Sequence, residues 1–331
     1  MYQAFYHLKD QAFRLTPDPA YIYMTAQHRE ALAALVYSVC TRPGLTVLAG
    51  EVGTGKTTLL YTLAELLNKR RFVTVMCTNP ALTREELFDF LMLKFGINCP
   101  PSKSRQLAGL EELLLRNRAD GRPSVLIVDE GHRLSPELLE ELRLLLNLET
   151  PREKLLQIII AGQPELTEIL QRPELRQLKQ RVSCQCQLHA LSPAELKEYI
   201  DHRLAQAGQP RQTLFSEAVI QKIHEYSGGI PRVVNTLCDT SLRHGFALQC
   251  PSITAAIMEE AARELDLVHP RGPDGGRSSE ARAAMPAKPS NGHAAAPDAK
   301  PAAATAYVPL ENYAARQKSL NFFGNLMSRW K

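Results

Sequence analysis

Five short apolar runs alternate with longer amphipathic stretches in the first part of the sequence. Four of them, at residues 45–49, 72–77, 124–128 and 155–162, are apolar almost throughout, as strands buried on both faces of a parallel sheet are. In the fifth, residues 182–188, apolar and polar positions alternate, which is typical of an edge strand with one wet face. Because helical patterns separate the runs, the sequence predicts an α/β domain with a five-stranded parallel sheet over residues 45–190.

Only helical patterns follow this region. Ser192, with Glu195 three positions later, forms a capping box at a helix start. Pro231 opens a later helix, and we expect Ser252 to cap the last one. The pattern predicts that residues 191–268 form an all-helical domain.

The C-terminal part has two compositions. Residues 269–305 are rich in Pro, Ala, Gly and Ser, and we predict that they form a disordered linker. The helical pattern returns over residues 306–331, where four apolar side chains share one stripe: Leu320, Phe323, Met327 and Trp330. A basic amphipathic helix of this length can lie in a membrane interface, fill a partner's groove or pack back on its own protein, but it cannot span a bilayer.

Composition narrows the class of protein. The chain has 331 residues, and its hydrophobic fraction of 44% and charged fraction of 22% are those of an ordinary soluble protein. Its net charge of +4 is too small to indicate a nucleic-acid partner by itself. Seven scattered cysteines suit a reducing compartment, and Cys184 and Cys186 are expected to point inward as small apolar side chains rather than bind a metal. Without a signal-peptide pattern or an apolar run of about 18 residues, the sequence predicts a cytoplasmic protein.

A phosphate-binding motif connects the first strand to the helix after it. Residues 50–57 read Gly-Glu-Val-Gly-Thr-Gly-Lys-Thr, which fits G-x-x-x-x-G-K-[ST] in the required strand-to-helix context. Glycines let backbone N–H groups turn toward phosphate oxygens, and the helix N-terminus adds partial positive charge. Lys56 can reach the β- and γ-phosphates, and the Thr57 hydroxyl can ligate magnesium. The residues predicted to bind a nucleoside triphosphate here are Gly50, Glu51, Val52, Gly53, Thr54, Gly55, Lys56, Thr57 and Thr58.

Polar side chains end the third and fourth apolar runs. Asp129 and Glu130 follow a run that we expect to be buried on both faces, and adjacent carboxylates there need partners. Magnesium at Asp129 and a nucleophilic water at Glu130 supply those partners. Gln163 either contacts the γ-phosphate or the attacking water, or it caps the loop before Pro164. Arg232 opposes the dipole of its helix by roughly 0.3–1 kcal/mol, so it either faces a phosphate or is a surface arginine.

Residues 1–44 form an aromatic-rich segment and a helix ahead of the P-loop strand. We expect this segment to wall the nucleotide pocket, with Tyr21, Tyr23 and His28 as candidates for the adenine wall. Equally, these side chains can simply pack the segment onto the core.

The arrangement of motifs resembles an AAA+ ATPase core, and residues 191–268 resemble its helical lid. Further motifs resemble the ExeA/GspA-type AAA+ secretion ATPases over residues 1 to about 268. These motifs are Tyr2…Phe5-Tyr6…Leu8, Thr16-Pro17-Asp18-Pro19, the P-loop, residues 142–150, Gly162-Gln163-Pro164-Glu165-Leu166 and Gly229-Ile230-Pro231-Arg232…Asn235.

This resemblance implies ATP hydrolysis with Mg²⁺ in a ring or other homo-oligomer, at the cytoplasmic face of an envelope secretion, pilus or export system. It implies that Asn79 is the polar partner of Glu130 and that Arg232 is the lid sensor. It also implies that Arg181 is the finger that acts on a neighbouring subunit, with Arg176 as the second choice.

The sequence departs from the family pattern in places. Ala12 stands where proline is usual, and Gly131-His132 replaces the usual Ala-Gln after the paired acids, but neither change removes a catalytic group. We expect neither the transmembrane helix nor the peptidoglycan-binding region of larger members, so peripheral contact with the inner membrane would run through residues 306–331 or a partner.

Two other functions compete with this interpretation. A DNA-dependent AAA+ ATPase of the transposition-regulator type has a similar core, but this sequence offers no zinc finger and does not cluster its basic residues on one element. Nucleic acid is therefore the less favoured partner. A nucleotide-sensing scaffold that does not hydrolyse is disfavoured because Glu130 is present.

Overall fold

The computed structural model describes residues 1–16, 18–42, 44–208 and 214–267. The predicted linker at residues 269–305 and the predicted helix at 306–331 lie outside this description. Within the described ranges, no helix combines the length and the apolar character needed to cross a bilayer.

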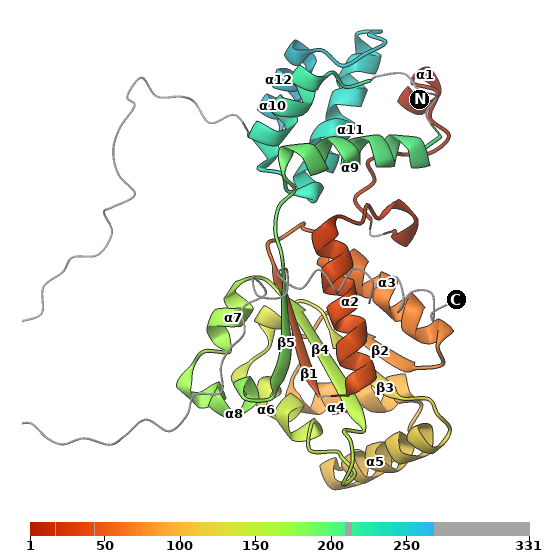
Figure 1. The fold of residues 1–331 in the computed structure, drawn as a ribbon, viewed down its shortest axis with the longest axis vertical. Helices are drawn as coiled ribbons and strands as arrows, with labels where there is room; N and C mark the ends of the chain where they lie inside the picture. Colours follow the sequence, from red (N-terminus) through yellow and green to blue (C-terminus); the bar gives the residue numbers. More distant parts are fainter. Residues whose placement is uncertain (17, 43, 209–213, 268–331) are drawn as a thin grey trace, which may run out of the picture. The chain divides into compact units, whose positions relative to one another are not determined.

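Five parallel strands form one sheet in the order β2-β3-β4-β1-β5 (Figure 1). Their bounds are β1 Leu45–Gly50, β2 Val73–Cys77, β3 Ser124–Val128, β4 Leu156–Gly162 and β5 Val182–Leu188. The predicted parallel sheet is confirmed, and β5 is an edge strand as its alternating pattern indicated. Because β1 lies between β4 and β5, the P-loop that follows β1 is close to the carboxyl end of β4.

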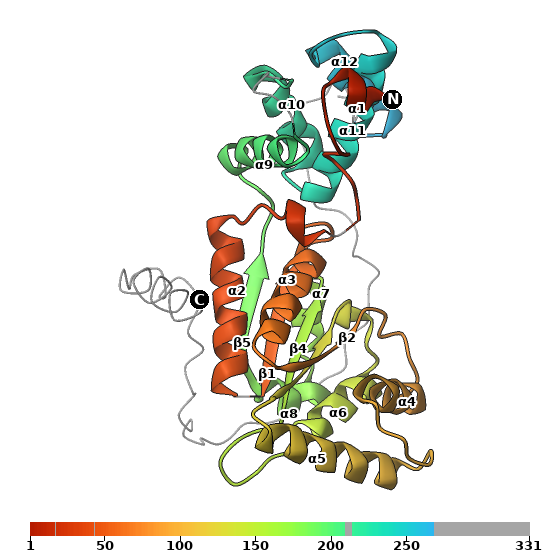
Figure 2. The ribbon, with the colours of Figure 1, turned by 90° about the vertical axis from the view of Figure 1, so that its right-hand side faces the viewer.

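Helices cover both faces of the sheet. Figure 2 shows α2 (Ala26–Thr41) and α3 (Lys56–Lys69) on one face. The other face shares a hydrophobic core with α4 (Arg84–Phe95), α5 (Lys103–Ala119) and α6 (Pro136–Leu145), and the short helices α7 (Glu165–Ile169) and α8 (Arg176–Lys179) extend it. Successive strand residues point to opposite faces, so β3 and β4 bury apolar side chains on both.

Four longer helices form the second hydrophobic core: α9 (Pro193–Gln206), α10 (Glu217–Ser227), α11 (Pro231–Ala247) and α12 (Ala255–Glu264). The capping box of Ser192 and Glu195 is present at the start of α9. The expected cap at Ser252 is wrong, because Thr254 caps α12 and accepts from the Ile257 backbone N–H. The chain is still extended at Ile253, whose N–H bonds the Leu214 carbonyl, so the helix begins only after that contact.

The first residues of the chain pack with these helices rather than with the sheet. The helix α1 (Tyr2–Phe5) and the 3-10 helix η1 (Pro19–Tyr21) flank a segment whose Tyr6, Leu8 and Phe13 are buried in the second core. The chain thus starts in the helical domain, builds the α/β domain and returns. One consequence is that residues of the N-terminal segment and of α11 both line the pocket at the P-loop.

Candidate nucleotide-binding site

The P-loop joins β1 to α3 and touches the helical domain. Gly55 is the N-cap of α3 with a φ of 96°, and Gly53 has a φ of 83°, so both use the left-handed region that glycine adopts without strain. A Cβ on Gly53 would lie 2.6 Å from the Arg232 Cβ, and the Arg232 backbone N–H bonds the Gly53 carbonyl at 3.3 Å. Gly53 therefore permits the close approach of α11 to the loop.

Lys56 is buried at 7% exposure, with its ammonium held by the loop itself. Its Nζ donates to the carbonyls of Gly50 at 2.6 Å and Glu51 at 2.8 Å. Burial lowers the pKa of Lys56, and the nearby carboxylates of Asp129 and Glu130 act in the opposite direction. A phosphate would offer the same ammonium a charged acceptor in a site where its charge is otherwise only partly balanced.

The two predicted magnesium ligands lie side by side. The Thr57 hydroxyl donates to Asp129 Oδ2 at 2.6 Å, while Asp129 Oδ1 accepts the Glu130 backbone N–H at 2.9 Å. Asp129 is only 2% exposed at the end of β3. A hydroxyl and a carboxylate are hard oxygen donors of the kind that Mg²⁺ prefers, so these residues fit the ion.

Glu130 reaches a neighbour that the sequence did not single out. Its backbone φ of 54° starts the 3-10 helix η2 (Gly131–Arg133), and its side chain is 41% exposed. Its side-chain neighbour is His132, whose Nε2 is 3.6 Å from Glu130 Oε2. The same ring contacts Gln163 through both its nitrogens. The only signal for this residue in the sequence is the departure from the family pattern at Gly131-His132.

The structure does not bring Asn79, the expected partner, to Glu130. Asn79 lies exposed beyond the end of the edge strand β2, and it is absent from the residues that line the pocket. No hydrogen bond joins Asn79 to Glu130 in the part of the chain that the structure describes. Since η2 turns the chain directly after Glu130, His132 occupies the place beside the carboxylate instead.

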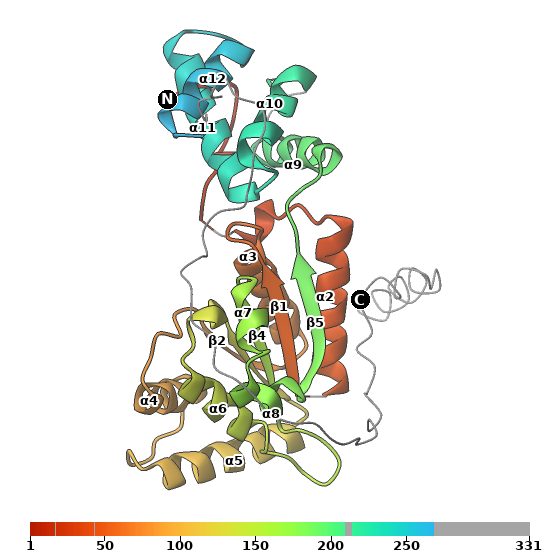
Figure 3. The ribbon, with the colours of Figure 1, turned by 90° about the vertical axis from the view of Figure 1, so that its left-hand side faces the viewer.

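Neither candidate finger belongs to the pocket of its own chain. Arg181 directly precedes β5, and the start of β5 pairs with Leu45 at the start of β1 (Figure 3). It lines a second pocket together with Leu146 and Lys154, at the amino ends of the strands. Arg176 is exposed on α8. The nucleotide-binding motifs follow the carboxyl ends of the strands, so Arg181 faces away from them.

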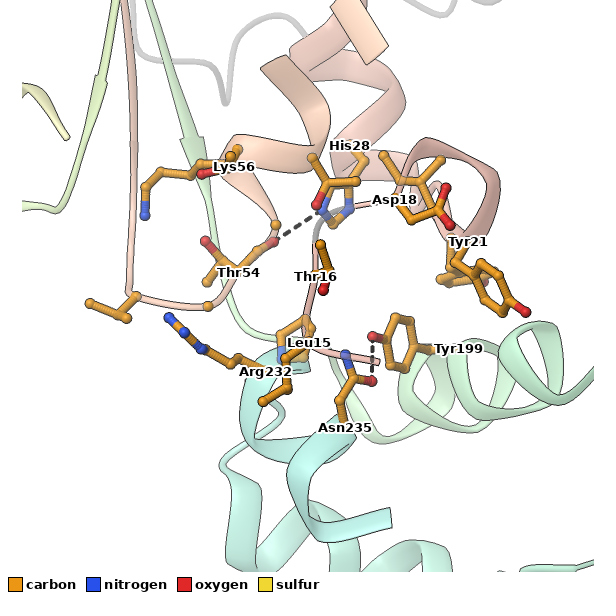
Figure 4. Close-up of a pocket in the computed structure, with 18 of the residues that line it drawn as sticks. Leu15, Thr16, Asp18, Tyr21, His28, Thr54, Lys56, Tyr199, Arg232 and Asn235 are labelled. Carbon is orange, nitrogen blue, oxygen red and sulfur yellow. Dashed lines mark hydrogen bonds between the residues drawn. The ribbon is translucent and has the colours of Figure 1, made fainter. Parts of the chain in front are cut away.

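Residues from three parts of the chain line one pocket (Figure 4). The N-terminal segment contributes Arg14, Leu15, Thr16, Asp18, Tyr21, Ile22, Tyr23 and His28. The α/β domain contributes residues 52–58, Glu130 and Gln163, and the helical domain contributes Leu191, Tyr199, Arg203, Pro231, Arg232 and Asn235. The structure therefore brings together the P-loop, the paired acids, Gln163 and Arg232.

The aromatic candidates of the N-terminal segment line this pocket, but most of their polar atoms form hydrogen bonds with other groups of the protein. His28 is buried, and burial lowers its pKa; its Nδ1 contacts the Thr25 hydroxyl at 2.7 Å and its Nε2 the Thr54 carbonyl at 3.2 Å. A carbonyl only accepts, so Nε2 carries the proton and His28 braces the P-loop. The Tyr21 hydroxyl donates to Asp10 at 2.9 Å.

A buried polar network in the helical domain ends at the pocket. Arg203 donates to the Ala12 carbonyl at 2.6 Å, the Arg14 carbonyl at 3.1 Å and the Tyr199 hydroxyl oxygen at 3.0 Å. The Tyr199 hydroxyl, which must therefore donate its own hydrogen, is 2.8 Å from Asn235 Oδ1. The amide nitrogen of Asn235 is thereby turned away from Tyr199, as an additional donor at the pocket (Figure 4).

Comparison with known proteins agrees with this geometry. A family model described as an AAA domain matches residues 14–170. General secretion pathway protein A of Aeromonas hydrophila is 40% identical over 276 residues, which cover 82% of this chain and 50% of that protein. Residues 14–170 thus match an AAA domain, and the chain is similar to general secretion pathway protein A over most of its own length. It spans about half the length of this curated relative.

Three solved structures share the fold at low sequence identity. ORC2 of Aeropyrum pernix, in ADPNP–ADP complexes, has a TM-score of 0.58 at 16% identity and covers 78% of this chain and 72% of its own. Cdc6p of Pyrobaculum aerophilum has a TM-score of 0.58 at 17% identity, with 78% and 71% covered. Drosophila ORC, solved bound to DNA, has a TM-score of 0.60 at 17% identity, with 80% and 66% covered. The predicted AAA+ P-loop fold is confirmed.

Proposed function

We propose that this AAA domain binds ATP with Mg²⁺ and hydrolyses it by in-line attack of a water molecule. The observation that carries the proposal is the meeting of Lys56, the Thr57–Asp129 pair and Glu130 at one pocket that also contains Arg232. Few other functions need a buried ammonium, a hard-oxygen metal site and a partly exposed carboxylate side by side.

Each residue has a stated part in this mechanism. Lys56 and Arg232 neutralise phosphate charge, and Thr57 and Asp129 would hold Mg²⁺, which supplies further neutralisation of the β- and γ-phosphate oxygens when bound. Glu130 polarises the attacking water, for which its 41% exposed carboxylate is accessible. Gln163 contacts the γ-phosphate or that water.

Turnover in this proposal needs a second copy of the chain. Arg181 lies at the opposite end of the sheet from its own pocket, so it can supply charge only to a neighbouring site in a homo-oligomer, with Arg176 as the second choice. Such fingers contribute about 10³–10⁵ in rate. A ring is the assembly that gives every pocket a neighbour.

The cellular role rests on the relative. Since general secretion pathway protein A is 40% identical over most of this chain, we propose that ATP turnover drives assembly or operation of an envelope secretion, pilus or export system. The partners would be proteins of that system, from the cytoplasmic side, with peripheral inner-membrane contact through residues 306–331.

The decisive experiment is Glu130→Gln. We expect the variant to keep its affinity for ATP and to lose turnover, because the amide cannot polarise the water but still fills the site. ATP affinity is measured by calorimetry and turnover by phosphate release on assembled protein. The matched control is Glu137→Gln, an exposed glutamate in the first turn of α6 outside the pocket, which should change neither quantity. Equal turnover of Glu130→Gln and wild type would remove Glu130 from the mechanism.

A further inference from the structure

His132 connects two groups of the proposed hydrolytic site that are far apart in sequence. Its Nδ1 lies 3.3 Å from the Gln163 backbone nitrogen, which donates to it. Its Nε2 lies 3.0 Å from the terminal amide of Gln163 and 3.6 Å from Glu130 Oε2. The side chain is 16% exposed, so water competes only partly for these contacts.

The backbone contact determines the tautomer of the ring. A backbone N–H can only donate, so Nδ1 of His132 must present a lone pair to Gln163. In a neutral imidazole the proton is then on Nε2. His132 therefore points an N–H donor at the space between the Gln163 amide and the Glu130 carboxylate.

That donor in turn determines how the Gln163 amide is oriented. An Nε2–H group facing an amide NH₂ would put two donors against each other at 3.0 Å. Amide oxygen and nitrogen are nearly isosteric, and their assignment follows from the hydrogen-bond network. The amide oxygen of Gln163 must hence face His132, which leaves its NH₂ as the donor available to the pocket that Gln163 lines.

We propose that His132 is a positioning residue that fixes Gln163 with its NH₂ toward the γ-phosphate and holds the Glu130 carboxylate beside it. The inference rests on the proposed function, because it assigns the γ-phosphate of ATP to this pocket. Without the ring, the Gln163 amide can rotate and present its oxygen to the phosphate, which is repulsive. Glu130 would also lose the one neighbouring N–H side-chain donor seen beside it in the described residues.

Three substitutions of His132 distinguish the contribution of Nε2 from that of Nδ1. His132→Gln can place an amide NH₂ near the Nε2 position, while His132→Asn can place an acceptor near Nδ1. His132→Ala keeps neither. We expect kcat to fall about 100-fold in the Ala and Asn variants, since a misplaced donor or carboxylate has consequences of that order. His132→Gln should recover most of kcat, and KM for ATP should rise by no more than about tenfold in the Ala and Asn variants, as expected for loss of one donor to a charged acceptor.

If His132 has only a structural role, a different variant is expected to recover kcat. If His132 only held the Gln163 backbone, the Asn variant would be rescued and the Gln variant would not. Thermal unfolding of all three identifies any variant that fails to fold. The Asn variant keeps an acceptor for the Gln163 backbone N–H, so it can fold even if the Ala variant does not. Rescue of kcat by Asn rather than Gln, or wild-type kcat in the Ala variant, would overturn the proposal.

A binding measurement tests the same inference without hydrolysis. The affinities of the full-length protein for ADP and for a non-hydrolysable ATP analogue are compared by calorimetry with Mg²⁺ present. We expect His132→Ala and Gln163→Ala each to reduce the preference for the triphosphate about tenfold, as loss of one donor to a charged acceptor does, and His132→Gln to restore it. An unchanged preference for the triphosphate over ADP in His132→Ala would contradict the positioning role. Wild-type protein that binds the analogue but leaves ATP intact would instead remove the proposed hydrolysis.

Discussion

The Tyr199 hydroxyl joins Arg203 to Asn235 in the buried network at the nucleotide pocket, and Tyr199→Phe removes that hydroxyl alone. The ring stays in place, so no cavity opens. What disappears is the acceptor for Arg203 at 3.0 Å and the donor to Asn235 Oδ1 at 2.8 Å.

The expected magnitude follows from the burial of the two partners. Arg203 is 7% exposed and Asn235 is 6% exposed, so water cannot freely hydrate the guanidinium and the amide that lose the Tyr199 hydroxyl. A buried polar group left without its partner costs about 1–3 kcal/mol, but Arg203 keeps its bonds to the Ala12 and Arg14 carbonyls. We therefore expect the free energy of unfolding to fall by about 2–3 kcal/mol.

Nucleotide affinity should fall as well, because the Asn235 amide is no longer held with its nitrogen toward the pocket. Loss of an oriented hydrogen bond of about 1 kcal/mol weakens ATP binding roughly fivefold. The measurements are urea unfolding without nucleotide and calorimetric ATP binding in conditions where the variant is fully folded.

Tyr6→Phe is the matched control in the same hydrophobic core. Tyr6 is 3% exposed and its hydroxyl donates to the Cys250 carbonyl at 3.0 Å, and neither residue is among those that line the pocket. It should lose about 1 kcal/mol of stability and no ATP affinity. If Tyr199→Phe binds ATP as tightly as Tyr6→Phe does, the proposed connection between the network and the pocket is wrong.

Two further predictions concern subunit contact and acid stability. Arg181→Ala should bind ATP normally and lose turnover about 10³-fold or more; mixing it with Lys56→Ala protein should restore part of the phosphate release, and failure at every ratio would argue against a shared site. Ion pairs with Arg118 and Arg42 lower the pKa of Glu153 below its unfolded value of about 4.3, so its stabilising contribution is present at neutral pH and is lost as the pH falls. Urea unfolding at pH 7 should therefore show Glu153→Gln less stable than wild type, with the gap closing below about pH 4; a gap that is constant with pH contradicts this account.

The sequence was sufficient wherever one continuous stretch carried the whole signal. Residues 50–57 form a P-loop because the glycines, the lysine and the flanking strand and helix are neighbours in the chain. The capping box at Ser192 is present for the same reason, since it is a contact between residues three positions apart. Ser252 failed because a single long-range contact, between Ile253 and Leu214, kept the chain extended past it.

Long-range neighbours were decided only by the fold. Both Asn79 and His132 were polar residues near Glu130 in the predicted topology, but only the turn of η2 determined that the ring stands beside the carboxylate and Gln163. Arg203 contacts residues of the N-terminal segment that precede it by about 190 positions, and no local pattern reports such a contact.

The sequence by itself therefore determined the chemistry available to this protein: a P-loop, two acids at the end of a buried strand and a parallel sheet to present them. The tertiary structure decided which side chains complete the site, because hydrogen-bond partners such as His132 and Gln163, or Arg203 and Ala12, are selected by where separate elements meet. Periodicity reports which face of an element is buried, while the partner across that face depends on packing of the whole chain.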